Sequence, residues 1–165
     1  MRIAAQVIVV SMIALAVVAC ILAQGATPRA ITAKDARDLV YAMLKADDWT
    51  KLSGFGFDTP YISPDFPGFY QIHAIYDNPG GSNTVGHYAV EQTTGEVWDW
   101  VICTRFATPA LLKAQQTLRK RMNLTDAEYK KLRKPGPFCE PGESPHVRND
   151  LGRPRADALG KSNRK

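Results

Sequence analysis

The sequence predicts an α+β domain, in which one helix packs on a three- or four-stranded antiparallel meander and two further helices follow. Three observations predict this class. Apolar residues recur at helical spacing across residues 33–46, and three segments between residues 69 and 104 alternate apolar with polar side chains. Two amphipathic stretches with capping residues follow residue 108. We expect residues 32–140 to form a single domain, since this length is usual for one core.

The first helix is predicted by its capping residues and by its apolar spacing. Thr32 is a good N-cap, and Asp35 stands three residues later, in the position that completes a capping box. The apolar face then carries Leu39, Val40, Met43 and Leu44. This spacing predicts a helix over 33–46. The following residues, 49–68, are rich in Gly, Pro and aromatic residues and predict an ordered loop over the core.

The meander is predicted from three alternating segments, residues 69–76, 85–92 and 97–104. Residues 77–83 form a turn cluster rich in Asn and Gly, and Thr93-Thr94-Gly95 is typical of a tight hairpin. The first helix should pack on the apolar face of this sheet. The side chains expected on that face are Tyr88, Val90, Trp98, Trp100 and Ile102.

Two helices and a tail are expected after the sheet. Thr108-Pro109 is typical of a helix start, because proline fits the first helical position. Thr125 and Glu128 form a second capping box, and the helix that they begin should end before Pro135-Gly136-Pro137. Residues 143–165 are rich in charged residues and poor in apolar ones, which predicts a disordered basic tail.

The basic character of the chain belongs to its C-terminal third. Residues 1–104 hold 6 Lys and Arg against 10 Asp and Glu, whereas residues 105–165 hold 15 against 6. Such a surface attracts anionic groups, so an anionic membrane surface or another polyanion is a candidate partner, without recognition of a specific nucleic acid. The candidate contact residues are Arg119, Lys120, Arg121, Lys130, Lys131, Arg133 and Lys134.

The first 23 residues have the pattern of an export signal, because Arg2 precedes an apolar run from residue 3 to residue 23 and small and polar residues follow. Three outcomes fit this pattern. The signal is cleaved, or Cys20 is lipidated within the lipobox-like Val17-Val18-Ala19-Cys20, or the run stays as an anchor, since about 20 apolar residues span a bilayer. All three place the rest of the chain outside the cytosol, in a bacterial periplasm, in the cell envelope or in the medium.

Two cysteines, Cys103 and Cys139, remain when Cys20 is assigned to the signal. In an oxidising compartment a pair of cysteines is bridged more often than free, so these two residues predict one disulfide. On the chain-entropy account, closing a loop of this length stabilises the fold by about 4 kcal/mol.

A polar face of the meander is the candidate for catalysis. His73, His87 and Glu91 alternate onto the outward side of the sheet, and a three-residue turn would place Asp99 opposite Ala89, between His87 and Glu91. Imidazoles and carboxylates on neighbouring strands can exchange protons or bind a divalent metal. One hypothesis is therefore that the protein is a small extracytoplasmic hydrolase whose catalytic residues are His73, His87 and Asp99. Since the sequence has no motif with metal-ligand or nucleotide-binding spacing, no metal or cofactor is expected.

The strand–turn–strand segment YAVEQTTGEV, residues 88–97, resembles the hairpin of PepSY-type exported domains. Together with the preceding helix, the resemblance covers about residues 32–104. It implies a non-enzymatic binding or inhibitory module of the cell envelope, with peptidases as one class of target, and it supplies no catalytic residues. The sequence therefore favours a non-catalytic module with an envelope protein as its partner, and the hydrolase is the alternative.

Overall fold

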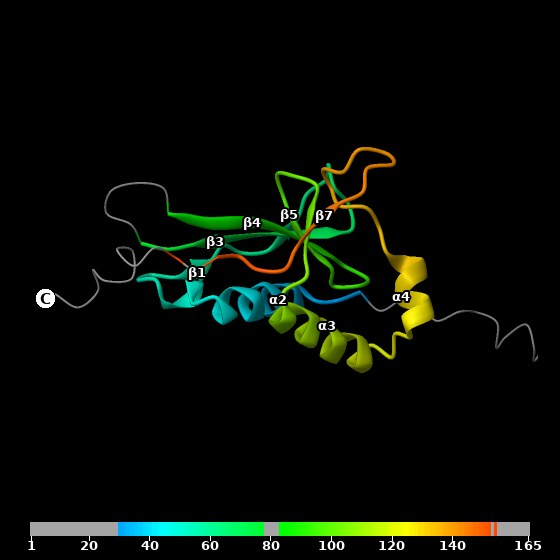
Figure 1. Cartoon of the computed structure of the whole chain (residues 1–165), viewed down its shortest axis with the longest axis horizontal. Coiled ribbons are helices and arrows are strands. Elements are labelled where there is room, and N and C mark those ends of the chain that lie inside the picture. The colour runs from blue at the N-terminus through cyan, green and yellow to red at the C-terminus, as the bar shows by residue number, and fades with distance from the viewer. Residues whose placement is uncertain (1–29, 78–82, 153, 155–165) are drawn as a thin grey trace, which may run out of the picture.

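The computed structural model describes residues 30–77, 83–152 and 154, and it confirms the α+β class (Figure 1). Its helices are α2 (Ala33–Ala46), α3 (Pro109–Arg121) and α4 (Asp126–Leu132), with one turn of 3₁₀ helix, η1 (Trp49–Lys51). The expected export signal and Cys20 lie outside the described residues. Within those residues, each helix is too short or too polar to span a membrane.

Seven strands of the described chain form one mixed sheet. They are β1 (Gly56–Phe57), β2 (Tyr61–Ile62), β3 (Phe69–Ile75), β4 (Thr84–Glu91), β5 (Val97–Asp99), β6 (Thr104–Phe106) and β7 (His146–Arg148). The order is β1-β3-β4-β5-β6-β7, and β2 also pairs with β3. Every pairing is antiparallel except that of β6 with β7, so the antiparallel meander expected from the sequence is the centre of a larger sheet.

The helices begin at the residues that their capping patterns predict. The Thr32 side chain accepts a hydrogen bond from the Asp35 backbone, and the Asp35 carboxylate accepts one from the Thr32 backbone. Thr125 and Glu128 exchange the same pair of bonds at the start of α4, and Thr108 caps α3. These bonds satisfy N–H groups that a helix start leaves without partners.

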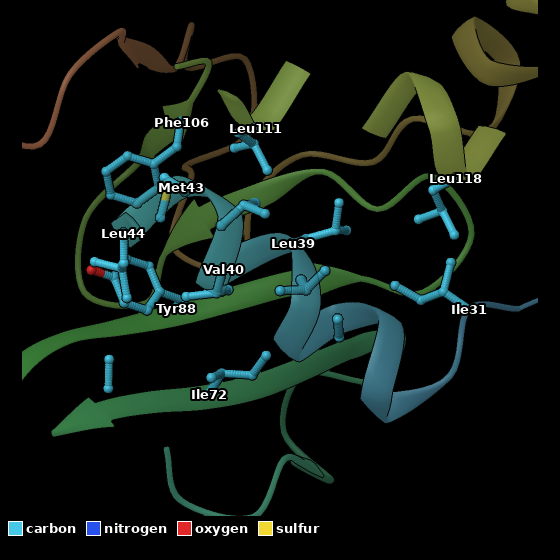
Figure 2. Packing of buried hydrophobic residues seen from close by; sticks show 14 residues of the cluster. Ile31, Leu39, Val40, Met43, Leu44, Ile72, Tyr88, Phe106, Leu111 and Leu118 are labelled. Atoms are coloured by element: carbon cyan, nitrogen blue, oxygen red, sulfur yellow. The ribbon is translucent and has the colours of Figure 1, made fainter. Parts of the chain in front are cut away.

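The main core lies between the sheet and the pair of helices α2 and α3, which run side by side in Figure 1. α2 buries one apolar face there, and α3 adds Leu111 and Leu118 (Figure 2). The sheet contributes Ile72, Tyr88 and Val90. Met43 and Leu44 of α2 are fully buried, so replacing either by alanine should cost about 2–5 kcal/mol of stability.

The third strand of the meander is shorter than expected. Asp99 ends β5, because its carboxylate accepts hydrogen bonds from the backbone N–H groups of Val101 (2.7 Å) and Ile102 (3.3 Å). These bonds turn the chain, which forms the separate strand β6 from Thr104. The single strand expected over 97–104 is therefore two strands joined by a loop, and Ile102 is exposed instead of facing the core.

The core face of β5 also differs from the expectation. Val90 lies opposite Val97, and Ala89 lies opposite Trp98. Side chains of opposed residues share a face of the sheet, so Val97 joins the main core with Val90. Trp98 points to the other face, where it packs with Phe69 and Ala89 in a second, smaller cluster.

Part of the expected disordered tail is ordered in the structure. β7 pairs in parallel with β6, and the chain after it returns to the start of the domain. There the Leu151 N–H donates to the Asp47 carboxylate, and the Gly152 carbonyl accepts from the Trp49 indole. Residues 143–152 therefore belong to the domain. The expectation for residues 155–165 concerns positions outside the described residues.

Candidate functional site

The outer face of the sheet is covered in part by an irregular segment, residues 133–139, which we call the roof. Gly136 lies against the Trp98 indole, and a Cβ atom at position 136 would lie 2.4 Å from the ring. Only glycine permits this approach. Lys134 lies above Gly68 and reaches within 4.0 Å of the buried Glu91 carboxylate.

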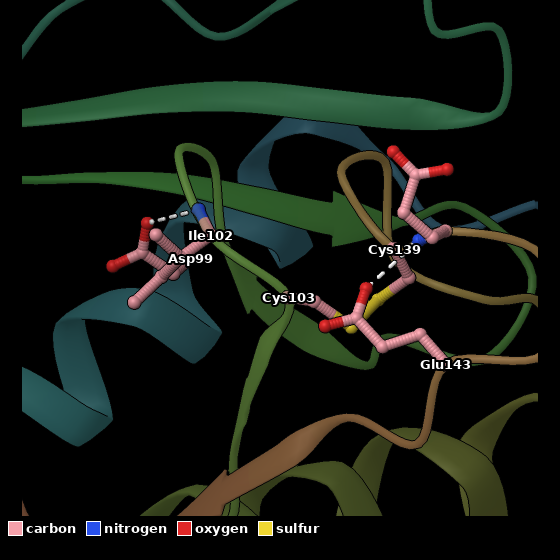
Figure 3. The surroundings of a disulfide bond; sticks show 6 residues. Asp99, Ile102, Cys103, Cys139 and Glu143 are labelled. Carbon is pink, nitrogen blue, oxygen red and sulfur yellow. Dashed lines mark hydrogen bonds between the residues drawn. A yellow bond between two sulfur atoms is a disulfide. The ribbon is translucent and has the colours of Figure 1, made fainter.

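A disulfide joins the roof to the sheet (Figure 3). Cys103 precedes β6, Cys139 ends the roof, and their Cα atoms lie 4.6 Å apart. This is the pairing that the sequence indicates. Glu143 lies close to both sulfur atoms, but each sulfur is bonded to the other, so this group has no thiolates to offer a metal ion.

Apolar residues precede each cysteine of the disulfide in the sequence, Trp100 to Ile102 before Cys103 and Phe138 before Cys139. The Phe66, Trp100 and Phe138 rings contact one another, with centroids 4.9 to 5.7 Å apart. Val101 is 63% exposed and Ile102 56%, in the loop that leads from Trp100 to Cys103. We call these five residues the disulfide surface. This surface was not predicted from the sequence, although Trp100, three residues before Cys103, and Phe138, directly before Cys139, were a signal.

The disulfide surface has the composition of a protein-binding site. Aromatic residues are enriched in interfaces, and large apolar side chains grouped in solvent are unusual on proteins that act alone. The ring contacts restrain the aromatic members of this surface, which reduces the entropy that binding would otherwise cost them.

Two buried glutamates lie at the end of the β4–β5 hairpin. Glu91 accepts hydrogen bonds from Thr93 and Thr94, which close the turn. Glu96 accepts from Arg105 of β6 and from the Tyr129 hydroxyl of α4. Burial, followed by this hydrogen bond, raises the pKa of Tyr129 to about 12, so its hydroxyl keeps its proton.

Glu96 is also the point where α4 is attached. α4 buries no residue of its own, and Arg133, directly after it, lies 3.0 Å from the Glu96 carboxylate. Arg119 of α3 lies over the Tyr129 ring, 4.1 Å from its centroid. Nothing local in the sequence shows that Glu96 is buried, so no role was predicted for it.

The seven basic residues expected to bind anions divide into two groups. Arg133 and Lys134 lie near the buried glutamates, Arg121 pairs with Asp35, and Arg119 lies over an aromatic ring. Among the described residues, the structure gives no hydrogen bond or ion pair to the side chains of the other three. These exposed side chains are Lys120, Lys130 and Lys131. Much of the predicted anionic-surface site is therefore engaged within the fold.

The histidines of the alternative catalytic set are brought together, but Asp99 is not. His73 and His87 lie directly opposite on β3 and β4, with ring centroids 4.4 Å apart. Asp99 lies opposite Tyr88, not Ala89 as expected, and therefore takes the other face of the sheet. Its carboxylate binds backbone N–H groups of its own turn. The register thus does not assemble His73, His87 and Asp99.

Comparison with known proteins adds one likeness in fold. No protein-family model matches the chain, and no curated protein matches it. A chain in the solved structure of a type VI secretion system effector–immunity complex from Pseudomonas protegens is similar, with a TM-score of 0.51 and 22% sequence identity. The match covers 66% of this chain and 91% of that chain. At this identity the likeness concerns the fold.

Proposed function

We propose that this chain is an exported, non-catalytic module that binds another protein and inhibits it. The observation that carries the proposal is the disulfide surface, Phe66, Trp100, Val101, Ile102 and Phe138. It combines exposed aliphatic residues with packed aromatic rings, the kind of side chains that contribute most to binding energy at the centre of an interface.

The likeness in fold supports a protein as the partner. The similar chain comes from an effector–immunity complex, which is an assembly of proteins. We propose the same kind of use here, in which the module occupies its partner one to one. The PepSY resemblance of residues 88–97 points to the same class of role.

Two features support a location outside the cytosol. Residues 1–23 have the pattern of an export signal, whichever of its three outcomes applies. The disulfide between Cys103 and Cys139 is of a kind that persists in oxidising compartments and is rare in the cytosol. The envelope or the medium is therefore where we propose that the partner is met.

The rival proposal, a hydrolase, rests on His73, His87 and Asp99 sharing one face of the sheet. Asp99 lies opposite Tyr88 and so takes the other face, and the carboxylate that pairs with His73 is Asp58, with Oδ2 3.5 Å from Nδ1. The geometry therefore favours binding over hydrolysis.

A site-specific cross-linking experiment tests the proposed function. A photoreactive phenylalanine analogue at Ile102, in the producing cell, should give one discrete adduct with a single protein. The matched control is the same analogue at Leu112, another large exposed apolar residue, which lies on α3. Adducts of equal yield at both positions, or none at Ile102, would contradict the proposal.

The identified partner then permits a quantitative test. Val101→Asp and Ile102→Asp should each weaken binding at least tenfold, because they put a charge into a desolvated contact, whereas Leu112→Asp should leave it unchanged. Inhibition should saturate at one molecule per partner. Equal binding by all three variants would remove the disulfide surface from the proposal.

A further inference from the structure

We propose that His73 and His87 form a binding site for a divalent ion of the later first-row transition metals, of which Zn²⁺ is the test case. The site lies on the outer face of the sheet, next to Trp100 of the disulfide surface, whose backbone N–H donates to the His87 carbonyl. It does not depend on the proposed function.

The backbone places the two imidazoles as a facing pair. The His73 carbonyl accepts from the Asp58 N–H, and the His87 carbonyl accepts from the Trp100 N–H. Both carbonyls therefore point away from the other histidine, so the two residues form a non-hydrogen-bonded pair of the antiparallel ladder. In such pairs the Cα atoms lie about 4.5 Å apart and the side chains are at their closest.

The ring geometry suits a shared ion. The ring centroids lie 4.4 Å apart, and the rings meet edge to face at 81°. Nitrogen atoms bound to one zinc ion each lie about 2.0–2.1 Å from it, so small rotations of two rings at this separation can direct a nitrogen of each to one point. Imidazole nitrogen is also the ligand that zinc, copper and nickel share.

A carboxylate orients one of the rings. Asp58 Oδ2 lies 3.5 Å from His73 Nδ1, and the Tyr61 ring meets the His73 ring edge-on from β2. Histidines that bind metals commonly direct their second ring nitrogen to a carboxylate, which fixes the ring and the tautomer. With Asp58 on the Nδ1 side, Nε2 of His73 is the nitrogen left for the ion.

The surroundings also favour the neutral form of His87 that a metal requires. Burial and the neighbouring His73 lower the pKa of His87, and Asp99, on the other face, opposes them. The His73 side chain is 29% exposed, so an ion can enter from solvent. No third side chain joins the pair in a closed cluster among the described residues, so water completes the coordination.

The chain contains three histidines, which gives the experiment an internal control. ZnCl₂ is titrated into the purified protein, and the imidazole resonances are followed by NMR. The His73 and His87 signals should shift together and saturate at one equivalent, whereas the His146 signal, from exposed β7, should stay in place. His73→Asn and His87→Asn should each weaken zinc binding at least tenfold, and His146→Asn should change it less than twofold.

A second readout separates binding from loss of structure. Zinc should raise the melting temperature of the original protein and of His146→Asn, but not that of folded His73→Asn or His87→Asn. A zinc affinity that survives in the double variant, or a shift of all three histidines alike, would overturn the site and indicate an adventitious ion only.

Discussion

Glu96 shows how much of the fold depends on one buried charge. Its side chain is 1% exposed, yet it meets Arg105 from β6, Tyr129 from α4 and Arg133 after α4. A buried carboxylate is costly unless its partners compensate for lost water, and here three segments supply partners to Oε1, whereas Oε2 has none among the described residues. The residue therefore connects the hairpin to the C-terminal third.

Removing that charge should weaken the fold and release α4. We expect Glu96→Gln to lower the free energy of unfolding by about 3 kcal/mol, because it leaves the two guanidinium groups without their carboxylate. Urea denaturation measures the loss, and hydrogen exchange should show faster exchange in Asp126–Leu132 but not in α2. The exposed Glu140→Gln is the control, with an expected change below about 0.5 kcal/mol. Equal effects of the two variants would contradict this role.

His87 predicts a dependence of stability on pH. Its pKa is lowered in the folded state, mainly by burial and then by His73, so the unfolded chain binds its proton more readily. Stability should therefore fall as the pH drops through about 6.5 and level off below the folded pKa. Asp99 opposes this lowering of the His87 pKa, and Asp58 is the carboxylate beside His73.

The measurement is urea denaturation at about pH 7.5, 6.5 and 5.5. That window lies above the region where Asp35 and Glu128 titrate, since their pKa values are lowered from values near 4. His87→Asn should show a smaller loss of stability across the window than the original protein. A loss of the same size in both would assign the effect to other groups.

At the scale of elements, the roof depends on a covalent bond. Residues 133–139 form no helix or strand, and the bond to Cys103 closes a separation of 36 residues. The roof covers Trp98, which belongs to the smaller apolar cluster on this face of the sheet. Without the disulfide, only non-covalent contacts would hold it there, chiefly Arg133 at Glu96, Gly136 against Trp98 and the ring contacts of Phe138.

Replacing both cysteines by serine should therefore lower the free energy of unfolding by about 4 kcal/mol, the loop-closure value for this separation. Amide exchange in residues 133–139 should accelerate, while α2 on the other face keeps its protection. The same result should follow from reducing the original protein. If the serine variant binds its partner with unchanged affinity, rigidity of the disulfide surface is not needed for binding.

Local signals predicted the elements that depend on neighbours in sequence. The capping boxes at Thr32 and Thr125 mark true helix starts, and the hairpin at Thr93-Thr94-Gly95 is present. The register of β5 was wrong by one residue. That shift moves Trp98 and Asp99 to the faces opposite to those expected, because side chains alternate along a strand.

Contacts between segments that are far apart in the sequence could not be predicted from local patterns. β7 is exposed along its whole length, so no apolar alternation indicated it, and it pairs with residues 42 positions earlier in the sequence, His146 with Thr104 and Arg148 with Phe106. The disulfide surface was missed for the same reason, since Phe66 and Phe138 come together only through the fold. The His73–His87 pair was placed on one face correctly, because both residues lie in well-marked strands.

At the scale of the whole molecule, some of the basic residues of the C-terminal third form ion pairs with acidic residues of the rest of the chain. The basic C-terminal third docks on the acidic remainder through Arg105 and Arg133 at Glu96 and through Arg121 at Asp35. The chain after β7 also returns to Asp47. These contacts thus hold the two oppositely charged parts of the chain together, while Lys120, Lys130 and Lys131 stay exposed.

The proposed compartment leads to a prediction about the protein as the cell makes it. If residues 1–23 direct export, protein purified from the producing cell should be found in the envelope or medium fraction. Its intact mass should show a new N-terminus, or a diacylglyceryl group on Cys20, or the retained segment in a membrane fraction. The mass should also lack two hydrogen atoms, because Cys103 and Cys139 are joined. A cytosolic protein with two titratable thiols at these positions would contradict the export signal, the oxidising compartment and the envelope partner together, whereas the zinc site on His73 and His87 would remain open to its own test.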